Sequence, residues 1–172
     1  MNTLKRCGAP NMAELLASPG FPDEDRMKKG PTLCIECVEE IPCNPCETSC
    51  PVGAISVGRP ITNLPLVDWD KCTACGVCLA VCPGLAIYLK DYTFEDGRGL
   101  ITFPYEYFPL PERGVEVDLV DRFGKFVCTG EVIRVVTTKR ADRTPLVSVA
   151  YRKSSFSEVV SMKRLAGPYS SV

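Results

Sequence analysis

The stretch CTACGVCLAVCP, residues 72–83, places four cysteines within twelve residues and ends in a proline. Gaps of two, two and three residues separate these cysteines. Proteins use thiols at this density for disulfide bonds, for a zinc ion or for an iron-sulfur cluster. The rest of the sequence distinguishes between these three kinds of site.

Length and composition argue against a disulfide framework. The chain has 172 residues, which suit one domain or a small domain with an appendage, and 45% of them are hydrophobic. It contains no run of about 18 apolar residues, so no transmembrane helix is expected, and its polar start does not resemble a signal peptide. We therefore expect a cytoplasmic protein, in a reducing compartment where the eleven cysteines serve as metal ligands.

Histidine is absent from the chain. Its absence excludes a mixed cysteine-histidine zinc site, a Rieske centre, a histidine-ligated haem and a Ser-His or Cys-His catalytic pair. The sequence also lacks a Gly-x-Gly-x-x-Gly fingerprint, a P-loop and a C-x3-C-x2-C motif. We therefore predict no catalytic site within the chain, and we expect any metal to be held mainly by sulfur.

The cysteine-rich region contains an internal repeat. The segment CNPCETSCPVGAI (residues 43–55) aligns with CGVCLAVCPGLAI (residues 75–87). The identical positions pair Cys43 with Cys75, Cys46 with Cys78, Cys50 with Cys82, Pro51 with Pro83, Ala54 with Ala86 and Ile55 with Ile87. The chain therefore contains a duplicated unit.

The two runs resemble the duplicated halves of a bacterial-type ferredoxin with two [4Fe-4S] clusters. The resemblance implies that three cysteines of each run hold one cluster, while the fourth crosses to the other cluster. It also implies a pair of βαβ-like halves wrapped around the clusters, in which a short helix starts at each fourth cysteine and the proline after it, Pro51 or Pro83, lies in the first turn. The implied ligands are Cys37, Cys43, Cys46 and Cys82 for cluster 1, and Cys72, Cys75, Cys78 and Cys50 for cluster 2.

The first run departs from the family pattern at its first ligand. The position that corresponds to Cys72 is Glu40, so the missing thiol must come from CIEC at residues 34–37. We prefer Cys37, because it leaves the shorter loop before Cys43, and we keep Cys34 as the reserve ligand. The departure also leaves a [3Fe-4S] form of cluster 1 open as an alternative.

The segment CIECVEEIPCNPC (residues 34–46) has a second interpretation, as two C-x2-C knuckles that hold one zinc ion. This site would use Cys43 and Cys46. It would therefore leave Cys50 and Cys82 without the roles that the repeat gives them, and we favour the clusters.

The fold class expected is α+β, with a ferredoxin-like two-cluster domain of pseudo-two-fold symmetry and a small C-terminal antiparallel β domain. The two-cluster domain spans residues 31–90, after an N-terminal arm at 1–30 in which Asn11 caps a short helix. An aromatic-rich connector follows at 91–111. Residues 112–172 alternate in the manner of β-strands, turn at 121–124 and end in a helix over 157–166 with Ser157 as its N-cap.

About two thirds of the chain lies outside the two-cluster domain, which suggests a dedicated subunit rather than a diffusing carrier. The segment IECVEEIPCNPCETSCPVGAI (residues 35–55) resembles small iron-sulfur subunits of flavin-dependent amine or proline dehydrogenases. That resemblance implies a hetero-oligomer in which electrons pass from a flavoprotein dehydrogenase through two [4Fe-4S] clusters to an acceptor. The alternatives are an autonomous soluble ferredoxin and a non-redox docking module stabilised by zinc or a cluster.

The charge of the chain argues against a nucleic-acid partner. The formal net charge is −1. Eight thiolates around two cluster cores of charge 2+ would change it to roughly −5.

Overall fold

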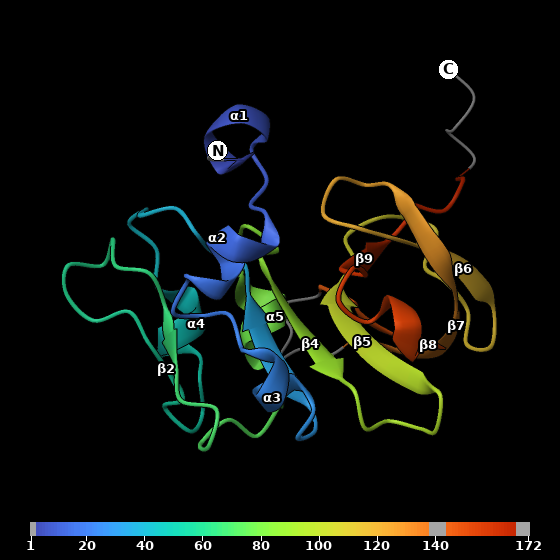
Figure 1. The fold of residues 1–172 in the computed structure, drawn as a ribbon, viewed down its shortest axis with the longest axis horizontal. Helices are drawn as coiled ribbons and strands as arrows, with labels where there is room; N and C mark the ends of the chain where they lie inside the picture. Colours follow the sequence, from blue (N-terminus) through green and yellow to red (C-terminus); the bar gives the residue numbers. More distant parts are fainter. Residues whose placement is uncertain (1–2, 138–143, 168–172) are drawn as a thin grey trace.

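The computed structural model describes residues 3–137 and 144–167. Its main element is a seven-stranded antiparallel sheet with the strand order β1-β4-β5-β8-β7-β6-β9, and a separate hairpin pairs β2 with β3 (Figure 1). The strands of the sheet are β1 Thr32–Ile35, β4 Ile87–Asp91, β5 Arg98–Pro104, β6 Glu116–Val120, β7 Phe126–Val136, β8 Leu146–Arg152 and β9 Ser161–Met162, and the hairpin comprises β2 Ile55–Ser56 and β3 Leu66–Val67.

The helices are short and lie mostly in the first half of the chain (Figure 1). They are α1 Thr3–Cys7, α2 Met12–Leu16, α3 Glu24–Met27, α4 Pro45–Thr48, α5 Val77–Val81 and the 3-10 helix η2 Lys153–Ser155. Within the described ranges, none of them is long and apolar enough to cross a bilayer.

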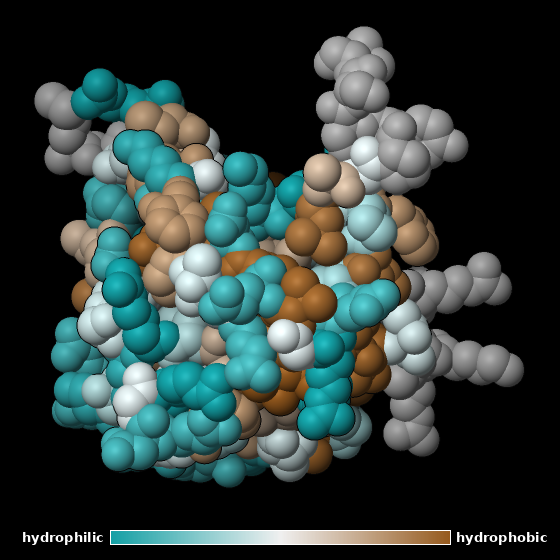
Figure 2. All heavy atoms as spheres, turned by 90° about the vertical axis from the view of Figure 1, so that its right-hand side faces the viewer, coloured by the Kyte–Doolittle hydropathy of each residue, from teal (hydrophilic) through white to brown (hydrophobic). Residues whose placement is uncertain are grey.

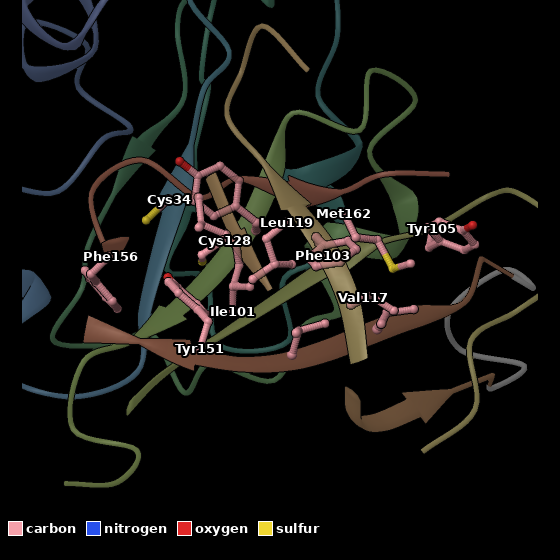
Figure 3. Close-up of a cluster of buried hydrophobic side chains, with 14 of the residues drawn as sticks. Cys34, Ile101, Phe103, Tyr105, Val117, Leu119, Cys128, Tyr151, Phe156 and Met162 are labelled. Atoms are coloured by element: carbon pink, nitrogen blue, oxygen red, sulfur yellow. The ribbon is translucent and has the colours of Figure 1, made fainter. Parts of the chain in front are cut away.

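The sheet curls around one apolar core to which all seven strands contribute (Figure 3). Its two ends approach each other, because Arg122, which follows β6, pairs with Glu36, which follows β1, at 2.9 Å. The core takes Cys34 from β1, Tyr88 from β4, Ile101 from β5, Val117 from β6, Cys128 from β7, Val149 from β8 and Met162 from β9. The interior of this curled sheet is therefore a packed core rather than a channel.

Strands β1 and β4 are buried on both faces, because a second apolar cluster covers their outer face. Leu33 and Ile35 of β1 and Ile87 of β4 pack there against Leu79 of α5 and Ile55 of β2. A strand covered on both sides is apolar at successive positions instead of alternating. The sequence TLCI of β1 has this character.

The repeat has a structural counterpart in two strand-helix-strand units, β1-α4-β2 and β3-α5-β4. The alignment of the two runs places α4 on most of α5, and β2 on the start of β4. The strands pair between the units, β1 with β4 and β2 with β3. The pseudo-symmetry therefore brings the two cysteine-rich runs to one side of the sheet.

The N-terminal segment before β1 packs against the rest of the chain instead of forming a separate arm. The predicted cap is confirmed: Asn11 Oδ1 accepts the Glu14 N–H at 2.9 Å, and the Glu14 carboxylate accepts the Asn11 N–H at 2.8 Å. Leu15 and Phe21 are buried in the main core, and Ile35 N–H donates to the Gly20 carbonyl at 3.0 Å.

The expected connector at residues 91–111 contains a central strand. β5 lies between β4 and β8, and its Phe103 is buried in the main core. The strands expected beyond residue 112 are present as β6, β7 and β8, with the turn at residues 121–124. They belong to the same sheet as β1 and β4, so the sheet crosses the boundaries predicted after residues 90 and 111.

The helix predicted over residues 157–166 with Ser157 as its N-cap is wrong. The 3-10 helix η2 lies just before this segment. The segment itself contains the short strand β9, whose Met162 pairs with Leu119 of β6. Val159 is fully buried, and Val160 N–H donates to the Val120 carbonyl at 3.0 Å. Pairing with the free edge of β6 satisfies this backbone and buries β-branched side chains, and it outweighs the local helix signal.

Figure 2 faces the side of the molecule on which β6, β7 and β8 are labelled in Figure 1, and it shows apolar side chains gathered between hydrophilic ones. The exposed apolar residues near this region include Val115, Phe123 and Phe126. Phe123 lies in the turn between β6 and β7, and Phe126 is the first residue of β7.

Candidate metal centre

Two cavities lie against the outer face of β1 and β4, and each is lined by four cysteines. The walls of the first include Ile35 and Ile87, and those of the second include Leu33 and Ile55. Cys37, Cys43, Cys46 and Cys82 line the first cavity, and Cys50, Cys72, Cys75 and Cys78 line the second. These are the two sets that the repeat and the ferredoxin resemblance group together, with the fourth cysteine of each run in the opposite cavity.

Short backbone elements position the thiols of the first cavity. Cys37 follows β1, where Glu36 N–H donates to the Ala86 carbonyl at 2.8 Å. Cys43 N–H donates to the Ile61 carbonyl at 3.2 Å. Helix α4 begins with Pro45 and carries Cys46 in its first turn. It ends at Thr48, before Cys50, so the expected helix with Pro51 in its first turn is wrong.

The second cavity is formed by a loop with left-handed backbone conformations. Ala74 and Gly76 have φ angles of 52° and 80°, so the chain turns sharply between Cys72 and Cys78. At Gly76 a side chain would be strained by this conformation, and its Cβ would lie 3.3 Å from Leu146. The glycine therefore lets the loop pack beneath β8 while its thiols face the cavity.

The buried thiols within each cavity act on one another electrostatically. Burial, followed by the neighbouring Cys82, raises the pKa of both Cys37 and Cys46, the latter to about 11. Burial and neighbouring thiols likewise raise the pKa of Cys72 and Cys78 in the second cavity. Four thiolates at such a site need a cationic centre to offset their repulsion and desolvation.

Cys50 differs from these thiols, because the backbone stabilises its anion. Ala54 N–H donates to Cys50 Sγ at 3.2 Å. Burial acts to raise the pKa of Cys50, but the N–H groups of residues 52–55 outweigh it and hold this pKa below its ordinary value. A thiolate that accepts N–H bonds is suited to ligate a metal cluster.

The N–H group of Ala54 is a functional feature that the pattern of cysteines does not identify. Ala54 and Ala86 match across the repeat, which marks both positions as small residues. The match does not reveal the direction of an N–H bond, because this depends on the turn after α4. The donor set otherwise consists of cysteines, and it fits an iron-sulfur cluster.

The two cavities adjoin each other through helices α4 and α5, which pack together. The charge of Cys46 on α4 contributes to the raised pKa of Cys78 on α5. Among the described residues, no three His, Cys, Asp or Glu side chains are arranged to hold a single metal ion.

The other three cysteines lie outside both cavities. Cys34 is fully buried in the main core, on the inner face of β1, and burial raises its pKa to about 12 (Figure 3). Cys128 is buried in the same core, and Cys7 is exposed on α1. The reserve ligand Cys34 is thus separated from the first cavity by the strand that carries it.

Comparison with known proteins places the cysteine-rich region in a described family. Residues 65–88 match the model of the 4Fe-4S binding domain. The chain is 48% identical to a subunit of the ion-translocating oxidoreductase complex of Methanosarcina acetivorans over 50 residues, 29% of the chain and 18% of the relative. It is 37% identical to an uncharacterized ferredoxin of Methanocaldococcus jannaschii over 71 residues, 40% of the chain and 42% of the relative.

The chain thus spans less than half the length of these two relatives. It covers 77% of the ferredoxin 7Fe of Hydrogenibacillus schlegelii, with 36% identity over 63 residues, or 37% of the chain. No solved structure matches the chain significantly. The coverage of more than two thirds of a ferredoxin, together with the 4Fe-4S binding domain, shows that the chain belongs to the ferredoxin family.

Proposed function

We propose that the chain carries two [4Fe-4S] clusters, one in each four-cysteine cavity. Cluster 1 is held by the cysteines of the first cavity and cluster 2 by those of the second. The observation that carries this proposal is the crossing of the two sets, since Cys50 lies with the second run and Cys82 with the first. A zinc site at residues 34–46 would not explain why Cys50 and Cys82 each lie with the other run.

When bound, each cluster exchanges one electron, with its charge spread over iron and sulfide. The chain sets the reduction potential at which this exchange occurs. The apolar walls of both cavities disfavour added negative charge, whereas the Ala54 N–H bond to Cys50 favours it. We expect the reduction potential of cluster 2, whose ligand Cys50 accepts this bond, to change with substitutions at residue 54.

Electrons can pass between the two cavities within the chain. Cys46 and Cys78 belong to different cavities, and their helices α4 and α5 pack together. This contact provides the short covalent and van der Waals route between the clusters. The chain therefore acts as a two-step relay.

We further propose that the relay works in a hetero-oligomer, between a flavoprotein dehydrogenase and an acceptor. One relative is described as a subunit of an oxidoreductase complex. Exposed side chains at the rims of the cavities support the proposal of a protein partner. Ile41 at the first cavity is 49% exposed, and Val52 at the second cavity is 41% exposed. Exposed aliphatic side chains beside a redox site provide a surface that a protein partner can cover.

The test is anaerobic purification of the native protein, with iron, sulfide and flavin counted per chain. About eight irons are expected, with visible absorption that dithionite bleaches, and a flavoprotein should co-elute. Cys75→Ser should remove about four irons, whereas Cys7→Ser, outside both cavities, should remove none. Zinc or a colourless protein would overturn the cluster proposal, and a brown monomer without flavin would favour the autonomous ferredoxin.

A further inference from the structure

A third cavity, without cysteines, lies between the N-terminal helices and β4. Its volume is about 240 Å³. Apolar side chains form most of its wall: Met12, Leu16, Phe21, Met27, Tyr92 and Phe156. Lys90 of β4 also lines it.

Lys90 is a buried cation without a counter-charge. The residue is 2% exposed, and its Nζ donates to the Phe156 carbonyl. Nζ also lies 5.1 Å from the ring centroid of Phe156 and 5.6 Å from that of Tyr88. Among the residues that the structure describes, Lys90 forms no ion pair. Burying an unpaired ammonium costs free energy that a bound anion could recover.

The nearest acidic group that acts on Lys90 already has its own partners. Glu36 influences Lys90 electrostatically, but its carboxylate accepts hydrogen bonds from Arg122 at 2.9 Å and from the Tyr88 hydroxyl. Arg122 and Cys34 also act on Lys90, and Arg122 disfavours its charged form. Burial is the largest effect, and it lowers the pKa of Lys90 to about 8.

The mouth of the cavity carries an excess of positive charge. Glu24 and Lys28 lie there and pair with each other at 3.5 Å. Lys153 lines the same cavity, with its Nζ 4.9 Å from the ring centroid of Tyr92. With Lys90 on the wall, an anion is favoured over a cation or a neutral molecule.

We propose that this cavity binds a small organic carboxylate with an apolar body, whose carboxylate pairs with Lys90. The apolar wall accommodates the body of the ligand, and the lysine selects its charge. A bare phosphate would match the charge but would leave the apolar wall uncovered. The proposal does not depend on the clusters, because none of the cysteines lines the cavity.

The test is isothermal titration calorimetry of the full chain with benzoate, hexanoate, benzamide and inorganic phosphate. Benzamide has the shape of benzoate without its charge, so this comparison needs no variant. Benzoate or hexanoate should bind one per chain, and benzoate at least about tenfold tighter than benzamide, since the charge pair is desolvated. Equal affinity for benzoate and benzamide, saturation by phosphate alone, or no saturable binding of either carboxylate would each overturn the proposal.

Variants locate the site. Lys90→Met should remove the preference for benzoate, whereas Lys29→Met, on the exposed surface and outside the cavity, should leave it unchanged. If Lys90→Met does not fold, Leu16→Trp serves in its place, because Leu16 lines the cavity and is 52% exposed. Benzoate affinity that survives the larger side chain at residue 16 would show that the ligand binds elsewhere.

Discussion

The buried charge of Lys90 should make stability depend on pH in a direction that the structure fixes. Burial lowers its pKa from the ordinary 10.5 to about 8. Between these values the unfolded chain binds more protons at this residue than the folded chain does. Stability therefore rises as the pH rises through this window.

The size of this effect follows from the gap between the two pKa values. Each factor of ten in proton affinity corresponds to about 1.4 kcal/mol, so full passage through the window changes the free energy of unfolding by about 3 kcal/mol. Cys34, the neighbouring thiol, has a pKa of about 12 and stays protonated throughout.

The assay is anaerobic urea unfolding of the wild type and of Lys90→Met at several pH values between 7 and 10.5. The difference between the two proteins isolates Lys90 from the other titrating groups. We expect Lys90→Met to gain stability relative to the wild type at pH 7, and most of that advantage to vanish near pH 10. Lys29→Met is the matched control, because this lysine is exposed, and its difference from the wild type should not vary with pH. A constant difference for Lys90→Met would refute the reasoning.

Four further predictions test the rest of the molecule. Cys37→Ser should lower the iron content from about eight to about four per chain, and Cys34→Ser should leave it at about eight; iron loss that follows Cys34 alone would reverse the assignment. Removal of the metal by a chelator should lower the melting temperature in calorimetry, since the metal-thiolate bonds that hold each cavity together are lost, and an unchanged value would contradict this. Arg122→Ala should cost about 3 kcal/mol in denaturant unfolding, because it leaves the mostly buried Glu36 carboxylate without a counter-charge, and a loss near zero would show that water reaches this carboxylate. Gly130→Ala should cost about 1–3 kcal/mol, because its Cβ would lie 2.6 Å from a side chain of β8; a neutral effect would mean that the sheet adjusts freely there.

Three of the four cysteines of each cavity could be predicted from local spacing, whereas the fourth comes from the other run and was implied by the ferredoxin resemblance. Within each run the gaps are so short that the backbone itself brings three thiols together. The Asn11 cap could be predicted for the same reason, since its partner Glu14 is close to it in the chain. Predictions that rest on residues close together in the chain do not require knowledge of the rest of the fold.

The continuity of the sheet could not be predicted, because it depends on contacts between segments that are distant in the chain. The repeat predicts β4 only as the counterpart of the first unit, and nothing local shows that its other edge pairs with β5. The strand β9 is very short, and its pairing partner Leu119 lies far from it in the sequence. The helix signal at residues 157–166 is therefore outweighed by an edge strand that the sequence does not reveal.

The choice between Cys34 and Cys37 shows the limit of motif spacing most clearly. A C-x2-C pair acts as a knuckle only where the chain turns between its two cysteines. Here Cys34 lies within β1, which ends at Ile35, and successive side chains of a strand point to opposite faces. Leu33 and Ile35 face the cavities, so Cys34 must face the main core, where it is fully buried. Cys37 lies beyond the end of the strand and is free of this alternation, which explains why only the second thiol of the pair reaches the first cavity.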